Sequence, residues 1–100
     1  MPVYMIIDVE VTDRETYAEY VNKVPSVVEK FGGRYLVRGG EVKVLAGDWR
    51  PERIVLLEFP SAEHLRRWLT SPEYAPLAAL REKSTRANAI VVEGLSRTVL

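Results

Sequence analysis

The sequence of 100 residues contains no cysteine and a single histidine, His64. The absence of cysteine excludes a disulfide framework, a cysteine-ligated zinc or iron–sulfur site and a thiol nucleophile. A single histidine also excludes a zinc site built from several histidines. Neither pair of adjacent glycines has the spacing of a phosphate-binding loop. We therefore expect no metal and no cofactor.

A net charge of either sign is also missing, because 14 Lys and Arg balance 14 Asp and Glu. A neutral chain lacks the positive field that attracts nucleic acids and acidic membranes, so we expect neither as a partner. No apolar run approaches the roughly 20 residues that span a bilayer, and the first residues lack the basic region and cleavage site of a secretory signal. These absences predict a cytoplasmic location.

What is present is the composition of a folded domain, with 47% hydrophobic and 28% charged residues. A chain of this length forms one domain with a modest core of its own. We expect that domain over residues 1–95 and a C-terminal tail over residues 96–100.

An alternating pattern and a capping motif locate the elements of the first third of the chain. Strict alternation of apolar residues predicts a strand over Val3–Val11. Thr12 and Glu15 match a capping box and predict the start of a helix, which should end at the glycine pair 32–33. Pro25 lies inside that helix and should kink or interrupt it, because its ring displaces the carbonyl four residues before it.

The segment after the second predicted strand, Arg34–Arg38, allows two interpretations. Gly39 and Gly40 form either a two-residue hairpin turn, after which residues 41–45 fold back, or a bulge at which one strand bends and continues. We favour the bulge, because a further strand follows the Gly-, Asp- and Pro-containing loop over residues 47–52.

The second half of the chain predicts two more strands and two helices. Arg53–Phe59 is apolar on both parities at its centre, which is typical of a strand buried on both faces. Ser61 is a natural N-cap for a helix over Ala62–Leu69, and Ser71 is one for a further short helix. Residues 87–95 are expected to form the last strand.

The order strand, helix, strand, strand, helix, strand predicts an α+β fold of the ferredoxin-like βαββαβ type. Its antiparallel sheet carries the helices on one face, with the first and third strands in the middle. The face without helices remains largely apolar, and an apolar patch of that size normally marks an interface. We therefore predict a homodimer in which two sheets meet across a two-fold axis.

Charged residues near the strand ends are candidates for a site. Antiparallel pairing makes Arg34 and Glu58 cross-strand neighbours, and it places Asp8 and Glu58 at opposite ends of the sheet, which excludes a glycosidase-like carboxylate pair. These residues form either ordinary cross-strand ion pairs, or a pocket in which Arg38 or Glu58 orients a ligand carboxylate or carbonyl.

The aromatic residues and the histidine also allow two interpretations. Tyr17, Tyr20, Trp49, Trp68 and Tyr74 should flank the helical side of the sheet, as core or as the wall of an apolar pocket. His64, in the first turn of a helix, is a solvated residue or an acid–base group. Arg81, Lys83 and Arg86 read as a solvated basic face. The candidate ligand-binding residues are Arg38, Trp49, Arg53, Glu58, His64, Trp68 and Tyr74.

Several motifs, in order along nearly the whole chain, resemble one family. They are Gly-Gly-Arg-Tyr-Leu-Val-Arg-Gly-Gly at residues 32–40, Trp-Arg-Pro at 49–51, Glu-Phe-Pro-Ser at 58–61, Trp68 with Ser-Pro-Glu-Tyr at 71–74, and Val-Glu-Gly at 92–94. This pattern resembles the small bacterial proteins of domain-of-unknown-function family thirteen-thirty. The resemblance implies the dimeric α/β-barrel form of the ferredoxin-like fold, and it implies no particular activity.

Two functions are compatible with these observations. The first is a small-molecule binder or enzyme with a pocket between helices and sheet in each subunit, for which Arg38, Arg53 and Glu58 supply the polar groups. The alternative is a non-catalytic dimeric module whose motifs serve fold and interface alone. Whether the protein is an enzyme is left open by the sequence.

Overall fold

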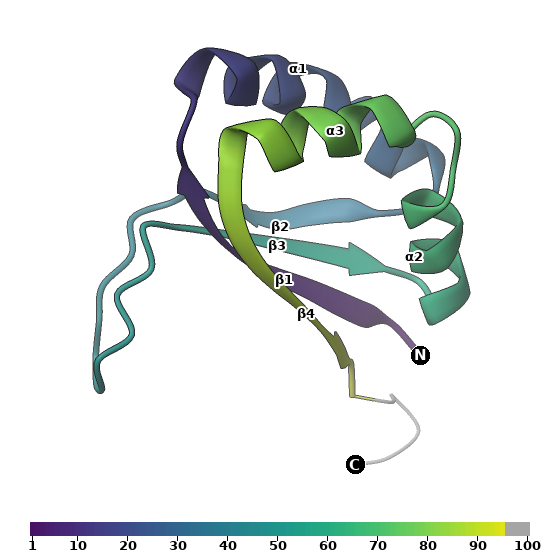
Figure 1. Cartoon of the computed structure of the whole chain (residues 1–100). Helices are drawn as coiled ribbons and strands as arrows, with labels where there is room; N and C mark the ends of the chain where they lie inside the picture. The colour runs from purple at the N-terminus through teal and green to yellow at the C-terminus, as the bar shows by residue number, and fades with distance from the viewer. Residues whose placement is uncertain (96–100) are drawn as a thin grey trace.

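The computed structural model of the chain describes residues 1–95 (Figure 1). The elements are, in chain order, β1 Val3–Val11, α1 Arg14–Lys30, β2 Arg34–Arg38, β3 Arg53–Phe59, α2 Ala62–Leu69, α3 Ala75–Ser84 and β4 Thr85–Glu93. The predicted tail over residues 96–100 lies outside the described residues. Within residues 1–95, no helix is both long enough and apolar enough to cross a membrane.

The strands form one antiparallel sheet in the order β2-β3-β1-β4, so the predicted ferredoxin-like α+β fold is confirmed. Figure 1 shows α1 and α3 side by side over one face of the sheet, with α2 at the end toward which β3 runs. No helix of the described residues covers the opposite face, and we call it the outer face. The helix-covered face is called the inner face.

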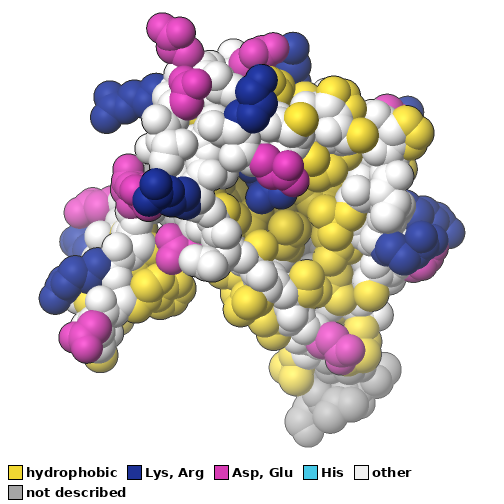
Figure 2. Space-filling view, in the orientation of Figure 1, with side chains coloured by type: hydrophobic (Ala, Val, Ile, Leu, Met, Phe, Trp, Pro, Cys, Tyr) yellow, Lys and Arg dark blue, Asp and Glu magenta, His cyan; other side chains and the backbone are white. Residues whose placement is uncertain are grey.

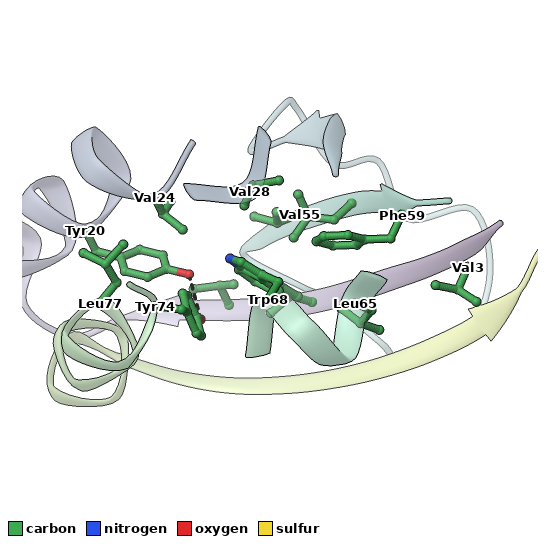
Figure 3. Packing of buried hydrophobic residues seen from close by; sticks show 13 residues of the cluster. Val3, Tyr20, Val24, Val28, Val55, Phe59, Leu65, Trp68, Tyr74 and Leu77 are labelled. Carbon is green, nitrogen blue, oxygen red and sulfur yellow. Dashed lines mark hydrogen bonds between the residues drawn. The ribbon is translucent and has the colours of Figure 1, made fainter. Parts of the chain in front are cut away.

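The core forms where the inner face meets the helices (Figure 3). Alternate residues of the central strands are buried, as the period of a strand requires. The buried hydrophobic residues are Val3, Ile7, Val9, Val55, Leu57 and Phe59 from the sheet, and Tyr20, Val24, Val28, Leu65, Trp68, Tyr74 and Leu77 from the helical layer. Burial of each larger side chain contributes about 1.5–3 kcal/mol to the free energy of unfolding.

The start of α1 differs from the prediction by one residue. Asp13, not Thr12, is the N-cap, and its carboxylate accepts hydrogen bonds from the backbone N–H and the hydroxyl of Thr16 at 3.2 and 2.7 Å. Those bonds hold the pKa of Asp13 below its usual value. Thr12 instead donates its N–H to the Ser84 carbonyl at 2.7 Å, which ties the end of β1 to the end of α3.

Pro25 does not interrupt α1, which is one continuous helix through the proline. The missing N–H and the ring clash cost about 3 kcal/mol or more in a helix interior. Val24 and Val28 on the same helix are buried in the core, and their packing holds both sides of the proline in place.

Both interpretations of the segment after β2 are wrong. The register shift lies between Tyr35 and Val37, and residues 39–52 form a long connection without regular structure, which we call the arm. Figure 1 shows the arm projecting away from the sheet. Gly39 turns the chain at φ +75° and donates to the Ile54 carbonyl at 3.0 Å. Residues 41–45 form no strand, and the next strand, β3, begins only at Arg53.

The third helix and the last strand also begin elsewhere than predicted. β4 begins at Thr85 rather than at residue 87. Ser71 does not cap α3, which starts at Ala75 with a proline in its first turn. The Ser71 hydroxyl instead accepts from the Tyr74 N–H at 3.1 Å and donates to the Trp68 carbonyl at 2.8 Å, which fixes the turn between α2 and α3. The N-cap role of Ser61 is confirmed by its bond with the His64 N–H at 3.2 Å.

The outer face is apolar at its centre. Its facing residues are Tyr4 and Ile6 of β1, Leu56 of β3, and Ile90 and Val92 of β4. Ile90 and Val92 are 58% and 44% exposed, and nearly all of β4 is uncovered on both sides. In Figure 2, which views the molecule from the side of α3, further hydrophobic side chains are gathered on the helix-covered side, below α3 and beside β4.

Gly33 allows the end of α1 to pack closely on β3, and we predict that Gly33→Ala destabilises the fold. A Cβ at this position would lie 2.6 Å from the Phe59 ring and 2.8 Å from Val28, both of which are fully buried. Such overpacking costs about 1–3 kcal/mol, measured as the free energy of unfolding in urea.

The matched control is Gly40→Ala, because a Cβ at Gly40 would meet nothing within 4 Å. Its free energy of unfolding should stay within about 0.5 kcal/mol of the wild-type value. Equal destabilisation by both substitutions would show that the contact with Phe59 is not the cause.

Candidate functional site

A small cavity lies between the helices and the inner face, at the end of the sheet where β2 ends and β3 begins. Its polar lining residues are Tyr17, Tyr20, Tyr35, Arg38, Arg53 and Arg81, and its apolar ones are Ile7, Val9, Val21, Val24, Val55 and Leu57. The enclosed part has a volume of about 20 Å³, which is room for one water molecule. An open groove of about 420 Å³ adjoins it and shares Tyr17, Val21 and Arg53 with it.

The register shift in β2 brings Arg38 to this cavity. Arg34 pairs with Glu58 on the outer face, so strict alternation would place Arg38 on the outer face as well. The extra residue between Tyr35 and Val37 changes the parity, and Arg38 pairs with the buried Val55 on the inner face. A one-residue irregularity therefore decides which arginine of β2 faces the helices.

Arg53, the first residue of β3, lies between the enclosed cavity and the open groove. Its Nε donates to the Tyr17 hydroxyl at 3.1 Å, and its guanidinium carbon lies 5.4 Å from the centre of the Tyr17 ring. A Cβ at Gly39 would come within 2.0 Å of the Arg53 Nη1 atom. The Arg53 guanidinium thus lies directly over the backbone of residue 39, where the φ of +75° favours glycine; a shift of the flexible end of the arginine would relieve the contact with a Cβ.

The cavity has three guanidinium groups and no carboxylate among its lining residues. Among the described residues, no carboxylate lies within 4.0 Å of Arg38 or Arg53. The Arg38 guanidinium instead lies 5.1 Å from the centre of the Tyr35 ring. Arg81 reaches the exposed Glu82 carboxylate only at 4.0 Å, and its buried Nε has no hydrogen-bond partner in the described structure.

The Tyr20 and Tyr35 hydroxyls of the lining are neutral at physiological pH. Burial raises the pKa of Tyr35 to about 12, and burial together with the neighbouring Tyr74 raises the pKa of Tyr20 well above its usual value. Figure 3 shows Tyr20 and Tyr74 pointing toward one another, with 3.2 Å between their hydroxyl oxygens. Tyr20 and Tyr35 therefore keep their protons, so their hydroxyls can act as hydrogen-bond donors.

Two sequence-predicted site residues lie on the opposite face of the sheet. Trp49 belongs to the arm and donates its indole N–H to the Asp8 carboxylate at 2.8 Å, beside Ile6 and Ile90 on the outer face. The expectation that Trp49 flanks the helical side is therefore wrong. Glu58 is also on the outer face, where it forms the predicted cross-strand ion pair with Arg34 at 2.7 Å.

The other candidates on the helical side are divided between the core and the far end of the sheet. His64 lies in the first turn of α2, with its Nδ1 2.7 Å from the Ser61 hydroxyl, at the end of the sheet opposite the cavity. Trp68 is core, with ring centres 5.4 Å from Phe59 and 4.3 Å from Tyr74. Only Tyr74 approaches the cavity, through the Tyr20 hydroxyl.

The sequence reasoning missed Tyr35 and Arg81. Arg81 follows the buried Leu77 by four residues, so it lies on the core-facing side of α3 rather than on a solvated face. A charged residue in an apolar stripe was the available signal. Within residues 1–95, no group of three or more His, Asp or Glu residues is arranged to hold a metal ion.

The comparisons with known proteins agree with the fold. Residues 2–95 match the family described as Domain of unknown function (DUF1330). The chain is similar in structure to the RPA0582 protein of unknown function from Rhodopseudomonas palustris, with 20% identity, coverage of 95% of this chain and 83% of that chain, and a TM-score of 0.79. A search of curated proteins found no match.

Two further solved structures share the fold at lower similarity. SnoaB, a cofactor-independent oxygenase from Streptomyces nogalater, has 10% identity, coverage of 99% and 98% of the two chains, and a TM-score of 0.65. An uncharacterized NIPSNAP domain protein from Burkholderia xenovorans has 10% identity, coverage of 97% and 97%, and a TM-score of 0.62. The chain therefore has the ferredoxin-like fold of the dimeric α/β-barrel proteins.

The buried phenols predict a loss of stability at alkaline pH. Tyr35 ionises near pH 10.0 in the unfolded chain and at about 12 in the folded one, so its neutral form favours folding. This contribution is complete below the unfolded pKa and is lost as the pH rises from there through the folded pKa. In Tyr35→Phe the free energy of unfolding should fall less steeply across that window, measured by urea denaturation at a series of pH values. Parallel curves for the two proteins would contradict this assignment.

Proposed function

Since the chain belongs to the DUF1330 family, a domain of unknown function, we propose a function from the geometry of its cavity. The protein binds a small organic molecule between α1, α3 and the inner face of the sheet. One observation carries the proposal, namely that three arginines and three tyrosines from four different elements meet at one small apolar cavity. Ligand sites typically combine an apolar lining with a few convergent polar groups.

The size of the cavity sets a condition on this proposal. Its enclosed part holds one water molecule, so an organic ligand has to occupy the adjoining groove and displace a side chain at the boundary. Arg53 is the side chain in that position. Among the described residues, the cavity lining has no histidine and no carboxylate, and the groove adds Arg14 and the Glu52 carboxylate. The proposal therefore concerns binding, and any proton transfer inside the cavity would involve the tyrosine hydroxyls.

We further propose that the protein acts as a homodimer with the two outer faces in contact. The support is the row of apolar side chains on a sheet face that no helix covers, with Ile90 and Val92 largely exposed. The fold is that of dimeric α/β-barrel proteins, which is consistent with the same arrangement. A cytoplasmic location remains a prediction from the sequence.

The dimer is tested by light scattering after size-exclusion chromatography. The wild type should have twice the chain mass of 11.4 kDa, and Ile90→Glu should shift it toward the mass of a single chain. The control is Leu69→Glu on α2, which is also exposed and lies away from the outer face. A monomeric wild type at micromolar concentration would contradict the proposal.

The alternative function, a non-catalytic dimeric module, is favoured by the volume of the enclosed cavity alone. A space of about 20 Å³ lined mostly by apolar residues is compatible with ordinary core packing. On this alternative, the arginines lie with their stems on the core and their charged ends in water. Ligand binding separates the two functions.

A thermal-shift screen with neutral and charged small molecules, followed by ligand-detected NMR, tests the binding function. We expect ligands whose binding Arg38→Met weakens by about tenfold or more, as loss of a charge-assisted hydrogen bond predicts. Arg66→Met on the exposed face of α2 should bind them as the wild type does. If no compound binds the wild type, the alternative function stands. If compounds bind the wild type and Arg38→Met changes only the melting temperature, Arg38 is structural and takes no part in binding.

A further inference from the structure

The charges around the cavity are unbalanced. Arg38, Arg53 and Arg81 come from β2, β3 and α3 and all line the same space, whereas its lining includes no carboxylate. Among residues 1–95, the one carboxylate within 4.0 Å of any of them is that of Glu82, whose side chain is 72% exposed. A guanidinium remains protonated in proteins, so the positive charge of this site is permanent.

The guanidinium groups also have unused hydrogen-bonding capacity. Arg53 donates through Nε to the Tyr17 hydroxyl, and Arg38 lies over the Tyr35 ring without a hydrogen bond among the described residues. The Nε atom of Arg81 is buried and has no partner there. A buried donor without an acceptor destabilises the protein, so a ligand that supplies the acceptor recovers this free energy.

The rest of the cavity lining indicates what kind of molecule would supply this hydrogen-bond acceptor. Behind the arginines the walls are valine, isoleucine and leucine side chains and tyrosine rings, which suit an apolar or aromatic body. The buried Tyr20 and Tyr35 hydroxyls keep their protons and therefore do not compete as anions for the arginines. The groove at the mouth adds Arg14 and Glu52 to the three arginines of the cavity, so cations outnumber carboxylates there by four to one, and apolar surface lies behind them.

We propose that the ligand of this site is a small organic anion, a carboxylate on an apolar or aromatic body, which enters from the open groove. Its carboxylate replaces the Tyr17 hydroxyl as the hydrogen-bond acceptor of the Arg53 guanidinium. The inference rests on the proposed binding function and names its ligand class. Arg53 now has one neutral acceptor and a contact with one ring. A carboxylate offers it two parallel charge-assisted hydrogen bonds, which are about twice as strong as neutral ones. This exchange of hydrogen-bond acceptors moves the Arg53 side chain, which lies at the boundary between the cavity and the groove, and so makes room there for the ligand.

The test compares benzoate with its neutral analogue benzamide at constant ionic strength and neutral pH. Binding to the ¹⁵N-labelled protein is followed by NMR through the arginine Nε–H signals, which report on Arg53 directly. Benzoate should bind about tenfold more tightly than benzamide, and it should shift the Arg53 signal as the acceptor changes from a phenol to a carboxylate.

Variants then show whether Arg53 is responsible. In Arg53→Met the affinities for benzoate and benzamide should lie within about twofold of each other, and Arg53→Lys should keep only part of the preference because its ammonium cannot form two parallel bonds. Arg66→Met, an exposed arginine on α2, should retain the full preference. If Arg53→Met does not fold, Arg38→Met serves as the second variant, and it should lower the preference as well.

The outcomes separate this inference from the proposed function. Equal binding of benzoate and benzamide in the cavity, or failure of both while neutral compounds from the screen bind there, overturns the anion and leaves the binding function in place. A preference for benzoate that persists in both Arg53→Met and Arg38→Met places the anion elsewhere and also overturns the inference. Failure of every compound in the screen overturns the binding function itself.

Discussion

The two-residue period of the antiparallel sheet is the constraint on which the rest of this structure depends. Each strand residue faces either the helices or the uncovered side, and the pairing of β1 with β3 fixes that choice for the whole molecule. Val55, Leu57 and Phe59 therefore enter the core, whereas Leu56 and Glu58 face outward. The core, the outer face and the cavity all follow from this division of side chains.

Among the described strands, the register shift in β2 is the one place where this period is broken, and it matters for the candidate site. It reverses the faces of the residues that follow it, so Arg38 joins Arg53 on the inner face while Arg34 remains with Glu58 on the outer face. The connection to Gly39 follows immediately, and the guanidinium of Arg53 occupies the space that the glycine leaves. Local backbone irregularity and the assembly of the arginines are therefore parts of one arrangement.

The sequence was informative wherever one strong local signal acted alone. Alternation located Val3–Val11 and Arg53–Phe59, and Ser61 marked the start of α2. It was less informative where two signals competed within a few residues. Thr12 and Asp13 are both good caps, and the sequence does not show that Thr12 is held by the Ser84 carbonyl. Pro25 signalled a break, but the burial of its neighbours in the core outweighed the lost hydrogen bond.

The sequence by itself determined the fold class, the family resemblance, the central position of β1 and β3, and the ion pair of Arg34 with Glu58, because these depend on periodicity and strand order. Only the tertiary structure decided on which face of the sheet the candidate site residues lie. It showed that Trp49 lies on the outer face with Asp8, and that Arg81 joins Arg38 and Arg53 at the cavity. The physical reason is that a bulge, a long arm and the packing of α3 place side chains through contacts between distant segments, and no short window of sequence contains both partners of such a contact.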